Sequence, residues 1–102
     1  IIIDYNKYMT LQSTKETINS KLIENFFKNN KDINFYSING HNFKSLKNCF
    51  SSVKKSTKSS IIFLNTIKGK GIKFMEDNII WHHKVPNHEE YSIAKKELQS
   101  ND

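Results

Sequence analysis

Arginine is absent from this 102-residue chain, which has only one cysteine, one proline and three glycines. A single cysteine, Cys49, can form neither an internal disulfide nor a zinc cluster of cysteines. Cys49 lies in an apolar pattern with helical spacing, so we expect a buried structural thiol rather than a nucleophile. No apolar run approaches the roughly 20 residues that a membrane span needs, and we expect a cytoplasmic protein without membrane contact.

The chain also lacks an initiator methionine, a charged leader and a signal-peptide cleavage pattern. It opens on Ile1–Ile3, and we expect it to be cut at the start of a buried strand. Hydrophobic residues make up 36% of the sequence, a low share for a chain with a core of its own. These features favour part of a larger domain whose core is completed by neighbouring segments.

The formal net charge is +6, and all 16 basic residues are lysines. A nucleic-acid surface would need lysines gathered with aromatic residues on one face. Here the lysines are spread along the chain, often beside glutamate, as in Lys15-Glu16 and Lys96-Glu97. We therefore expect no nucleic-acid partner, and polyanion binding stays a minor alternative.

Short apolar runs alternate with segments of helical periodicity, which predicts an α/β fold with a parallel sheet flanked by helices. Ligands of such sheets bind beyond the carboxyl ends of the strands. The expected strands are Ile1–Asp4, Ile33–Ile38 and Ile61–Leu64; the expected helices are Thr14–Asn29, Phe43–Lys55 and Glu89–Gln99; residues 72–86 are expected to be irregular.

The expected helices have recognisable starts and apolar faces. Ser13 with Glu16, and Asn87 with Glu90, have the spacing of capping boxes, and Asn42 can cap the middle helix. The expected inner faces comprise Ile18, Leu22, Ile23, Phe26 and Phe27 in the first helix and Phe43, Leu46, Phe50 and Val53 in the second.

Two segments leave the expected strands at their carboxyl ends. In the first, Asn6 offers an amide oxygen and Tyr8 a backbone carbonyl, which suit a magnesium ion already held by a diphosphate. An ordinary asparagine turn is the alternative. The second segment, Thr66–Gly71, combines two glycines with Lys68 and Lys70 and is either an anion site or a simple turn.

Histidines form the densest chemical cluster, in Trp81-His82-His83-Lys84. Histidine can transfer a proton or bind an anion near neutral pH. On an extended backbone His82 and His83 would point apart, so both cannot easily face one site. Zinc bound by His82, His83 and His88 is a minor alternative because no further ligand pair supports it. His41, in a turn, is expected to make a structural hydrogen bond.

Taken in order, four segments resemble the transketolase family. The family's pattern is a strand ending in Asp-x-Asn, a Gly-His-Asp turn, a Thr-x-Lys-Gly-x-Gly loop, and Trp-His-Gly-Lys before a helix. The matching segments are Asp4-Tyr5-Asn6, Gly40-His41-Asn42, Thr66–Gly71 and Trp81–Lys84. The resemblance covers essentially residues 1–102 and implies the C-terminal portion of a thiamine-diphosphate-binding domain, a partial form of that fold.

The resemblance also implies roles for individual residues. Asn6 would bind magnesium or calcium through its side chain, and Tyr8 through its backbone carbonyl. Asn6, Lys68 and His82 would contact thiamine diphosphate, and His82 would also be catalytic beside the reacting sugar. His41 would be structural.

Several positions depart from the family's pattern. Asn39 and Asn42 replace aspartates, His83 stands where many relatives have glycine, and Lys7 replaces a glycine or small residue. The family's Gly-Asp-Gly segment, which supplies the carboxylate ligand of the metal, is absent from these 102 residues. The isolated chain is therefore expected to be inactive.

The implied reaction transfers a two-carbon ketol unit from a ketose to an aldose, both commonly sugar phosphates. The implied partners are the missing remainder of the enzyme or a separate C-terminal subunit, in a dimer. Two alternatives stay open: a related enzyme of the same cofactor, such as deoxyxylulose-phosphate synthase or a pyruvate-dehydrogenase-like component, and a non-catalytic relic or interaction module.

Overall fold

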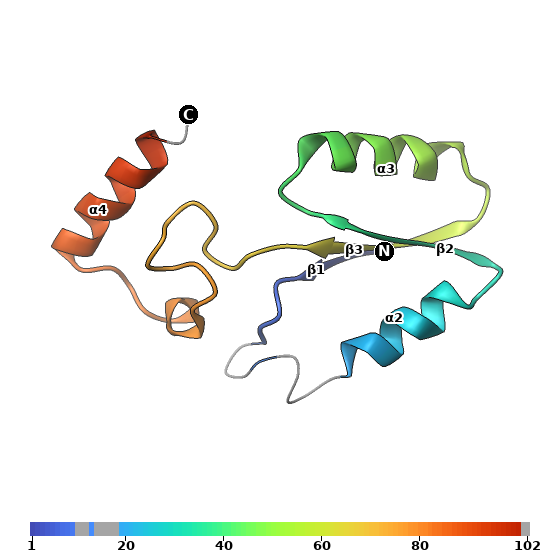
Figure 1. Ribbon diagram of the computed structural model, residues 1–102, viewed down its shortest axis with the longest axis horizontal. Helices are drawn as coiled ribbons and strands as arrows, with labels where there is room; N and C mark the ends of the chain where they lie inside the picture. Colours follow the sequence, from blue (N-terminus) through green and yellow to red (C-terminus); the bar gives the residue numbers. More distant parts are fainter. Residues whose placement is uncertain (10–12, 14–18, 101–102) are drawn as a thin grey trace.

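The computed structural model describes residues 1–9, 13 and 19–100. The three strands form one parallel sheet in the order β1-β3-β2, and Figure 1 shows α2 and α3 on its opposite faces, with α4 away from the sheet. The α/β class with a parallel, helix-flanked sheet is confirmed. The elements are β1 (Ile2–Tyr5), α2 (Ser20–Lys28), β2 (Ile33–Asn39), α3 (Phe43–Lys55), β3 (Ser59–Asn65), η1 (Ile79–His82) and α4 (His88–Gln99).

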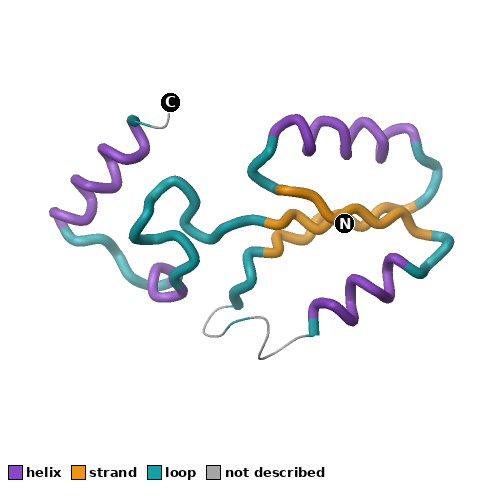
Figure 2. The backbone as a smooth tube through the Cα atoms, viewed as in Figure 1, coloured by secondary structure: helices purple, strands orange, loops and turns teal. Residues whose placement is uncertain are grey.

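The register brings the carboxyl ends of all three strands to one edge of the sheet. Asn65 at the end of β3 lies opposite Tyr5 of β1 on one side and Asn39 of β2 on the other. The loops that follow these strands therefore leave from the same edge, and the long loop after β3 leads from there to η1 and α4 (Figure 2).

The centre of the core is β3, which is covered on both faces. Ile61, Ile62 and Phe63 are each 3% exposed, as the continuous apolar run in the sequence predicts. The ring of Phe63 lies 5.3 Å from that of Phe35 and 6.0 Å from that of Tyr5. Burial of each large apolar side chain contributes about 1.5–3 kcal/mol, so this strand is the main source of stability in the sheet.

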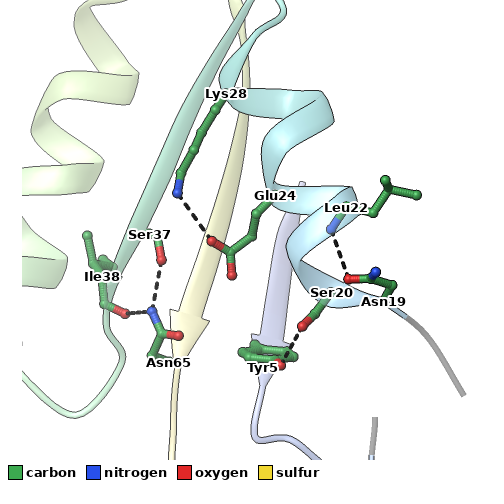
Figure 3. A network of polar contacts seen from close by, with 9 residues as sticks. All are labelled: Tyr5, Asn19, Ser20, Leu22, Glu24, Lys28, Ser37, Ile38 and Asn65. Carbon is green, nitrogen blue, oxygen red and sulfur yellow. Dashed lines mark hydrogen bonds and ion pairs between the residues drawn. The ribbon is translucent and has the colours of Figure 1, made fainter. Parts of the chain in front are cut away.

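Polar contacts near the carboxyl edge fasten neighbouring elements together (Figure 3). The Asn65 amide donates to Ser37 Oγ at 3.0 Å and to the Ile38 carbonyl at 3.1 Å, which ties β3 to β2. The Tyr5 hydroxyl lies 2.7 Å from Ser20 Oγ and joins β1 to the first residue of α2. These contacts fix the strand ends from which the candidate site is built.

The helices α3 and α4 begin where their caps predict. Asn42 accepts from the Ser45 backbone N–H at 2.9 Å, and Asn87 forms a capping box with Glu90. Cys49 is 5% exposed and free, and burial raises the pKa of its thiol, as expected for a structural cysteine. In the part of the chain that the structure describes, no helix has the length and apolar character needed to cross a membrane.

The helix predicted over Thr14–Asn29 is wrong at its start. Asn19 has a non-helical backbone (φ −74°, ψ 86°) and caps α2 by accepting from the Leu22 N–H at 3.2 Å. An asparagine at this position marks the start of a helix, because its side chain accepts a hydrogen bond from one of the first backbone N–H groups, which have no partner within the helix. The expected cap Ser13 instead forms an isolated bridge with Tyr8, and residues 14–18, including Glu16, lie outside the described residues.

The predicted inner faces are only partly buried. Leu22 and Phe26 of α2 are 70% and 65% exposed, and Phe43 and Phe50 of α3 are 89% and 42% exposed. The accessible surface is 7803 Å², whereas a compact monomer of this mass exposes about 6,000 Å². The radius of gyration is 16.6 Å against about 13 Å for a compact domain of this length. The apolar faces therefore extend beyond what these residues cover themselves.

Candidate functional site at the carboxyl edge of the sheet

Asp4 joins the two loops that leave the neighbouring strands β1 and β3. Its carboxylate accepts hydrogen bonds from the Asn6 amide at 3.4 Å and from the Thr66 hydroxyl. The Thr66 N–H also donates to the Tyr5 carbonyl at 3.3 Å. Because Asp4 binds the NH2 group of Asn6, the amide oxygen of Asn6 is left facing the other way. Asp4 was not predicted as a site residue, since its role depends on β1 lying beside β3.

The loop after β1 is a tight turn built on Asn6. The Asn6 amide oxygen accepts from the Tyr8 N–H at 3.0 Å, which fixes the two predicted metal ligands relative to each other. Between them Lys7 has φ +69°, in the left-handed region that favours glycine. Glycine, the residue that the family's pattern leads us to expect here, would adopt this conformation more easily than lysine.

Asp77 connects this turn with the loop that carries Lys68. The Tyr8 hydroxyl donates to the Asp77 carbonyl, and the Asp77 N–H donates to the Lys68 carbonyl at 3.0 Å. Asp77 itself has φ +51°, which aspartate tolerates better than most residues. Two loops far apart in sequence are thus held together, and no local pattern in the sequence indicated this role.

The segment Thr66–Gly71 folds back on its own continuation. Gly69 has φ +73°, and a Cβ there would lie 2.5 Å from the Met75 carbonyl oxygen, so the position requires glycine. Glu76 Oε1 accepts from the Gly71 N–H and from Lys70 Nζ, both at 3.1 Å. These bonds, the backbone one first, lower the pKa of Glu76. Lys70 is therefore paired with a carboxylate, whereas the Lys68 side chain makes no hydrogen bond or ion pair within the described ranges.

A hollow of about 500 Å³ opens at this edge of the sheet. Its charged lining comes from Lys7 after β1 and Lys70 after β3, and His41 after β2 adds an imidazole. Asn39, Asn65 and Thr66 contribute further polar groups. The hollow has the position and the polarity expected of an anion site in a parallel sheet. Of the two loop lysines, Lys70 rather than Lys68 lines it.

The turn after β2 makes the structural hydrogen bond expected of His41, although the bond reaches another loop. The His41 Nε2 accepts from the Ile67 N–H at 2.8 Å. The replacement residues Asn39 and Asn42 both act as hydrogen-bond acceptors: Asn39 Oδ1 binds the His41 N–H at 2.9 Å, and Asn42 caps α3. Amide oxygens here do what aspartate carboxylates would do.

His82 lies at the end of η1 and does not reach the other predicted site residues. Its ring contacts that of His83 edge-to-face at 4.6 Å. The expectation that the two histidines point apart on an extended backbone is wrong, because η1 is a 3-10 turn within residues 72–86. The Trp81 indole donates to the Phe74 carbonyl at 3.0 Å, and the Lys84 ammonium lies 4.3 Å from the Trp81 ring centroid.

The donor chemistry of the Asn6 turn is compatible with magnesium or calcium. Both ions take neutral oxygen ligands, and magnesium usually keeps several ligands from phosphate and water. Within the described ranges, no three His, Cys, Asp or Glu side chains gather as a metal site, and the trio His82, His83 and His88 forms none. Asn6 and Tyr8 can thus supply two ligands of a metal whose remaining ligands come from elsewhere.

Curated proteins that are similar in sequence to this chain are named as transketolase subunits. A protein of Actinobacillus succinogenes, named as one subunit of apulose-4-phosphate transketolase, is 29% identical over 99 residues, 97% of this chain. A protein of the same name from Phocaeicola vulgatus is 34% identical over 62 residues, 60% of the chain. The 6-deoxy-6-sulfo-D-fructose transketolase subunit SqwG of a Clostridium species is 38% identical over 64 residues, 62% of the chain. The chain is homologous to transketolase subunits.

The similarity to proteins named as transketolase subunits confirms the resemblance to that family. It is limited in extent: the chain spans 36% of the Actinobacillus protein, and the matched parts span 22% and 23% of the other two. No model of a known protein family matches the chain. The three-stranded parallel sheet is consistent with part of the thiamine-diphosphate-binding domain of transketolases.

Proposed function

We propose that the chain is part of a transketolase-type enzyme that uses thiamine diphosphate and a divalent metal, magnesium or calcium. In this proposal the enzyme moves a two-carbon ketol unit from a ketose to an aldose. The observation that carries the proposal is the meeting of the Asn6 turn and the Lys68 loop around Asp77, at the carboxyl edge of two neighbouring strands. The homology to transketolase subunits supports it independently.

Each candidate residue has a distinct task in this proposal. Asn6 and the Tyr8 carbonyl hold the metal, and Asp4 orients the Asn6 amide through its hydrogen bond. Lys68, whose side chain makes no hydrogen bond or ion pair within the described ranges, places a positive charge beside the phosphates of the cofactor, and Lys70 adds to the positive charge of the neighbouring hollow that it lines. When bound, thiamine diphosphate supplies the carbon nucleophile and stabilises the carbanion formed on it. The protein's contribution is to orient the cofactor and neutralise its charge.

The names of the relatives suggest the kind of sugar. Two sugars appear in the names of these relatives, apulose 4-phosphate and 6-deoxy-6-sulfofructose. Both carry an anionic group, which is a phosphate in the first and a sulfonate in the second. We extend this to the present chain and propose a ketose with an anionic terminal group as its substrate. The net charge of +6 favours the approach of such a substrate.

His82 is proposed to act on the reacting sugar rather than on the cofactor alone. In the complete assembly, His82→Ala is expected to lower turnover by about 100-fold, because a positioned acid–base group typically contributes 10²–10⁴-fold. Cofactor affinity should change much less. His88→Ala is a suitable control, since His88 is an exposed residue at the start of α4. Unchanged turnover in His82→Ala would rule out this role.

The working enzyme is proposed to need more chain than these residues, including a separate C-terminal subunit in a dimer. The relatives of which the chain spans about a third or less are themselves named as subunits. The exposed apolar side chains of α2, with Leu22 and Phe26 more than half exposed, are suited to packing against such additional segments.

Calorimetric titration with thiamine diphosphate and magnesium tests the proposal. We expect negligible binding by residues 1–102 alone, because Asn6 and Tyr8 supply no carboxylate ligand, and clear binding by the full-length protein with its partner. Tight binding by the isolated chain would contradict the proposed division of ligands. A full assembly that binds no cofactor would favour the non-catalytic alternative, and product analysis would separate transketolase from related enzymes of the same cofactor.

A further inference from the structure

The turn after β2 packs closely against the end of β3. The Gly40 N–H donates to the Asn65 carbonyl at 2.9 Å. A Cβ at Gly40 would lie 2.5 Å from Thr66 Cγ2 and 3.1 Å from Leu64 Cβ. Such distances leave no room for any side chain, so glycine is required here by close approach. The turn therefore has a fixed position relative to the start of the loop that follows β3.

His41 uses this fixed position to reach the loop. Its own N–H is held by Asn39 Oδ1 at 2.9 Å, and its Nε2 accepts from the Ile67 N–H at 2.8 Å. Ile67 directly precedes Lys68. Since Nε2 acts as the acceptor, the imidazole is neutral and carries its proton on Nδ1.

The loop after β3 is thus anchored on two sides. On the β1 side, Thr66 is held by the Asp4 carboxylate and the Tyr5 carbonyl. On the β2 side, Ile67 is held by His41. A loop fixed at two successive residues from opposite sides has a defined exit direction.

We propose that neutral His41 is a positioning residue that sets the course of the loop Thr66–Gly71 and thereby the place of Lys68. The contribution to cofactor binding rests on the proposed function, whereas the contribution to loop order does not. This role requires an unprotonated Nε2, because an imidazolium ion has no acceptor nitrogen.

Amide hydrogen exchange in the full-length protein tests this assignment. In His41→Ala, exchange of the amides of residues 67–71 is expected to become about tenfold faster at neutral pH, the effect of losing one hydrogen bond. His41→Gln should keep most of the protection, because a glutamine carbonyl oxygen can replace the Nε2 acceptor. His83→Gln is the matched control, since the His83 side chain lies outside this loop.

The pair of variants distinguishes the loss of an acceptor from other causes, because alanine removes the acceptor and glutamine supplies another. Unchanged protection in His41→Ala would overturn the proposal, as would protection in His41→Gln as low as that in His41→Ala. Calorimetry on the same variants reads the proposed function separately: a wild type that binds no thiamine diphosphate refutes that function and leaves the exchange result decisive for His41.

Discussion

Replacing Asn6 by alanine is expected to weaken magnesium-dependent binding of thiamine diphosphate by the full-length assembly roughly 10- to 100-fold, the scale of losses around metal sites. The substitution removes the proposed metal ligand and also the acceptor that holds the Tyr8 N–H at 3.0 Å. One substitution therefore removes the side-chain ligand and also releases the turn that holds the Tyr8 carbonyl in position. Calorimetric titration at fixed magnesium concentration measures the effect.

Asn30 offers a matched control for Asn6. Its side-chain oxygen accepts from the Asp32 N–H at 2.9 Å, so it builds the same kind of asparagine turn between α2 and β2, at the opposite edge of the sheet. Asn30→Ala should change cofactor affinity by less than about twofold, within the small range typical of surface substitutions. Equal losses of affinity in the two variants would show that Asn6 acts through stability and not as a ligand.

Gly69→Ala is expected to cost the full-length protein roughly 2–4 kcal/mol of unfolding free energy or to force the loop into another course. Two effects add at this residue. The φ angle of +73° is unfavourable for alanine, and the new Cβ would meet Met75 backbone atoms at 2.5 and 2.7 Å. Backbone atoms cannot move aside without displacing the whole segment. Urea unfolding measures the change.

Gly71→Ala separates these two effects. Gly71 also has a left-handed backbone, with φ +100°, but a Cβ there would meet only Leu98 Cδ2, at 3.4 Å. We expect a loss of about 1–2 kcal/mol, which reflects the backbone conformation without the overlap. A loss at Gly71 as large as that at Gly69 would contradict the importance of the Met75 contact.

The sheet could be predicted because its signals are local. The apolar run Ile61–Leu64 indicates a strand buried on both faces, and β3 is that strand at the centre of the sheet. Asn42 marks the start of α3, which the structure places at Phe43–Lys55 as expected. Alternation of strands and helices then restricts the sheet to parallel pairing, which places the candidate loops at one edge.

Helix boundaries were less predictable because more than one residue can cap the same helix. Burial was less predictable because it depends on which element covers an apolar face. Two asparagine or serine caps, at Ser13 and Asn19, could begin the first helix, and sequence spacing does not decide between them. Helical periodicity identifies an apolar face but not the element that covers it. Leu22 and Phe43 therefore belong to such faces and are nevertheless 70% and 89% exposed.

In the candidate site, too, features with a local sequence signal could be predicted and features that depend on tertiary contacts could not. Motif order pointed to Asn6, Lys68 and His82, but not to the residues that hold their segments in place. Asp4 was missed because its partners come from two strands, and Asp77 because its contacts come from two distant loops. Tertiary contacts create these roles: the pairing of β1 with β3 brings Asp4 to Thr66, and the contact between the two loops brings Asp77 to Tyr8.

The strand order β1-β3-β2 also bears on how this piece adds to a larger architecture. In the described residues β1 and β2 each pair on one side only, so both borders of the sheet present a row of free backbone donors and acceptors. Further strands can extend the sheet in either direction without disturbing the loops at its carboxyl edge. A longer sheet grown from β1 would bring new loops next to Asn6, where the proposed metal still needs its remaining ligands.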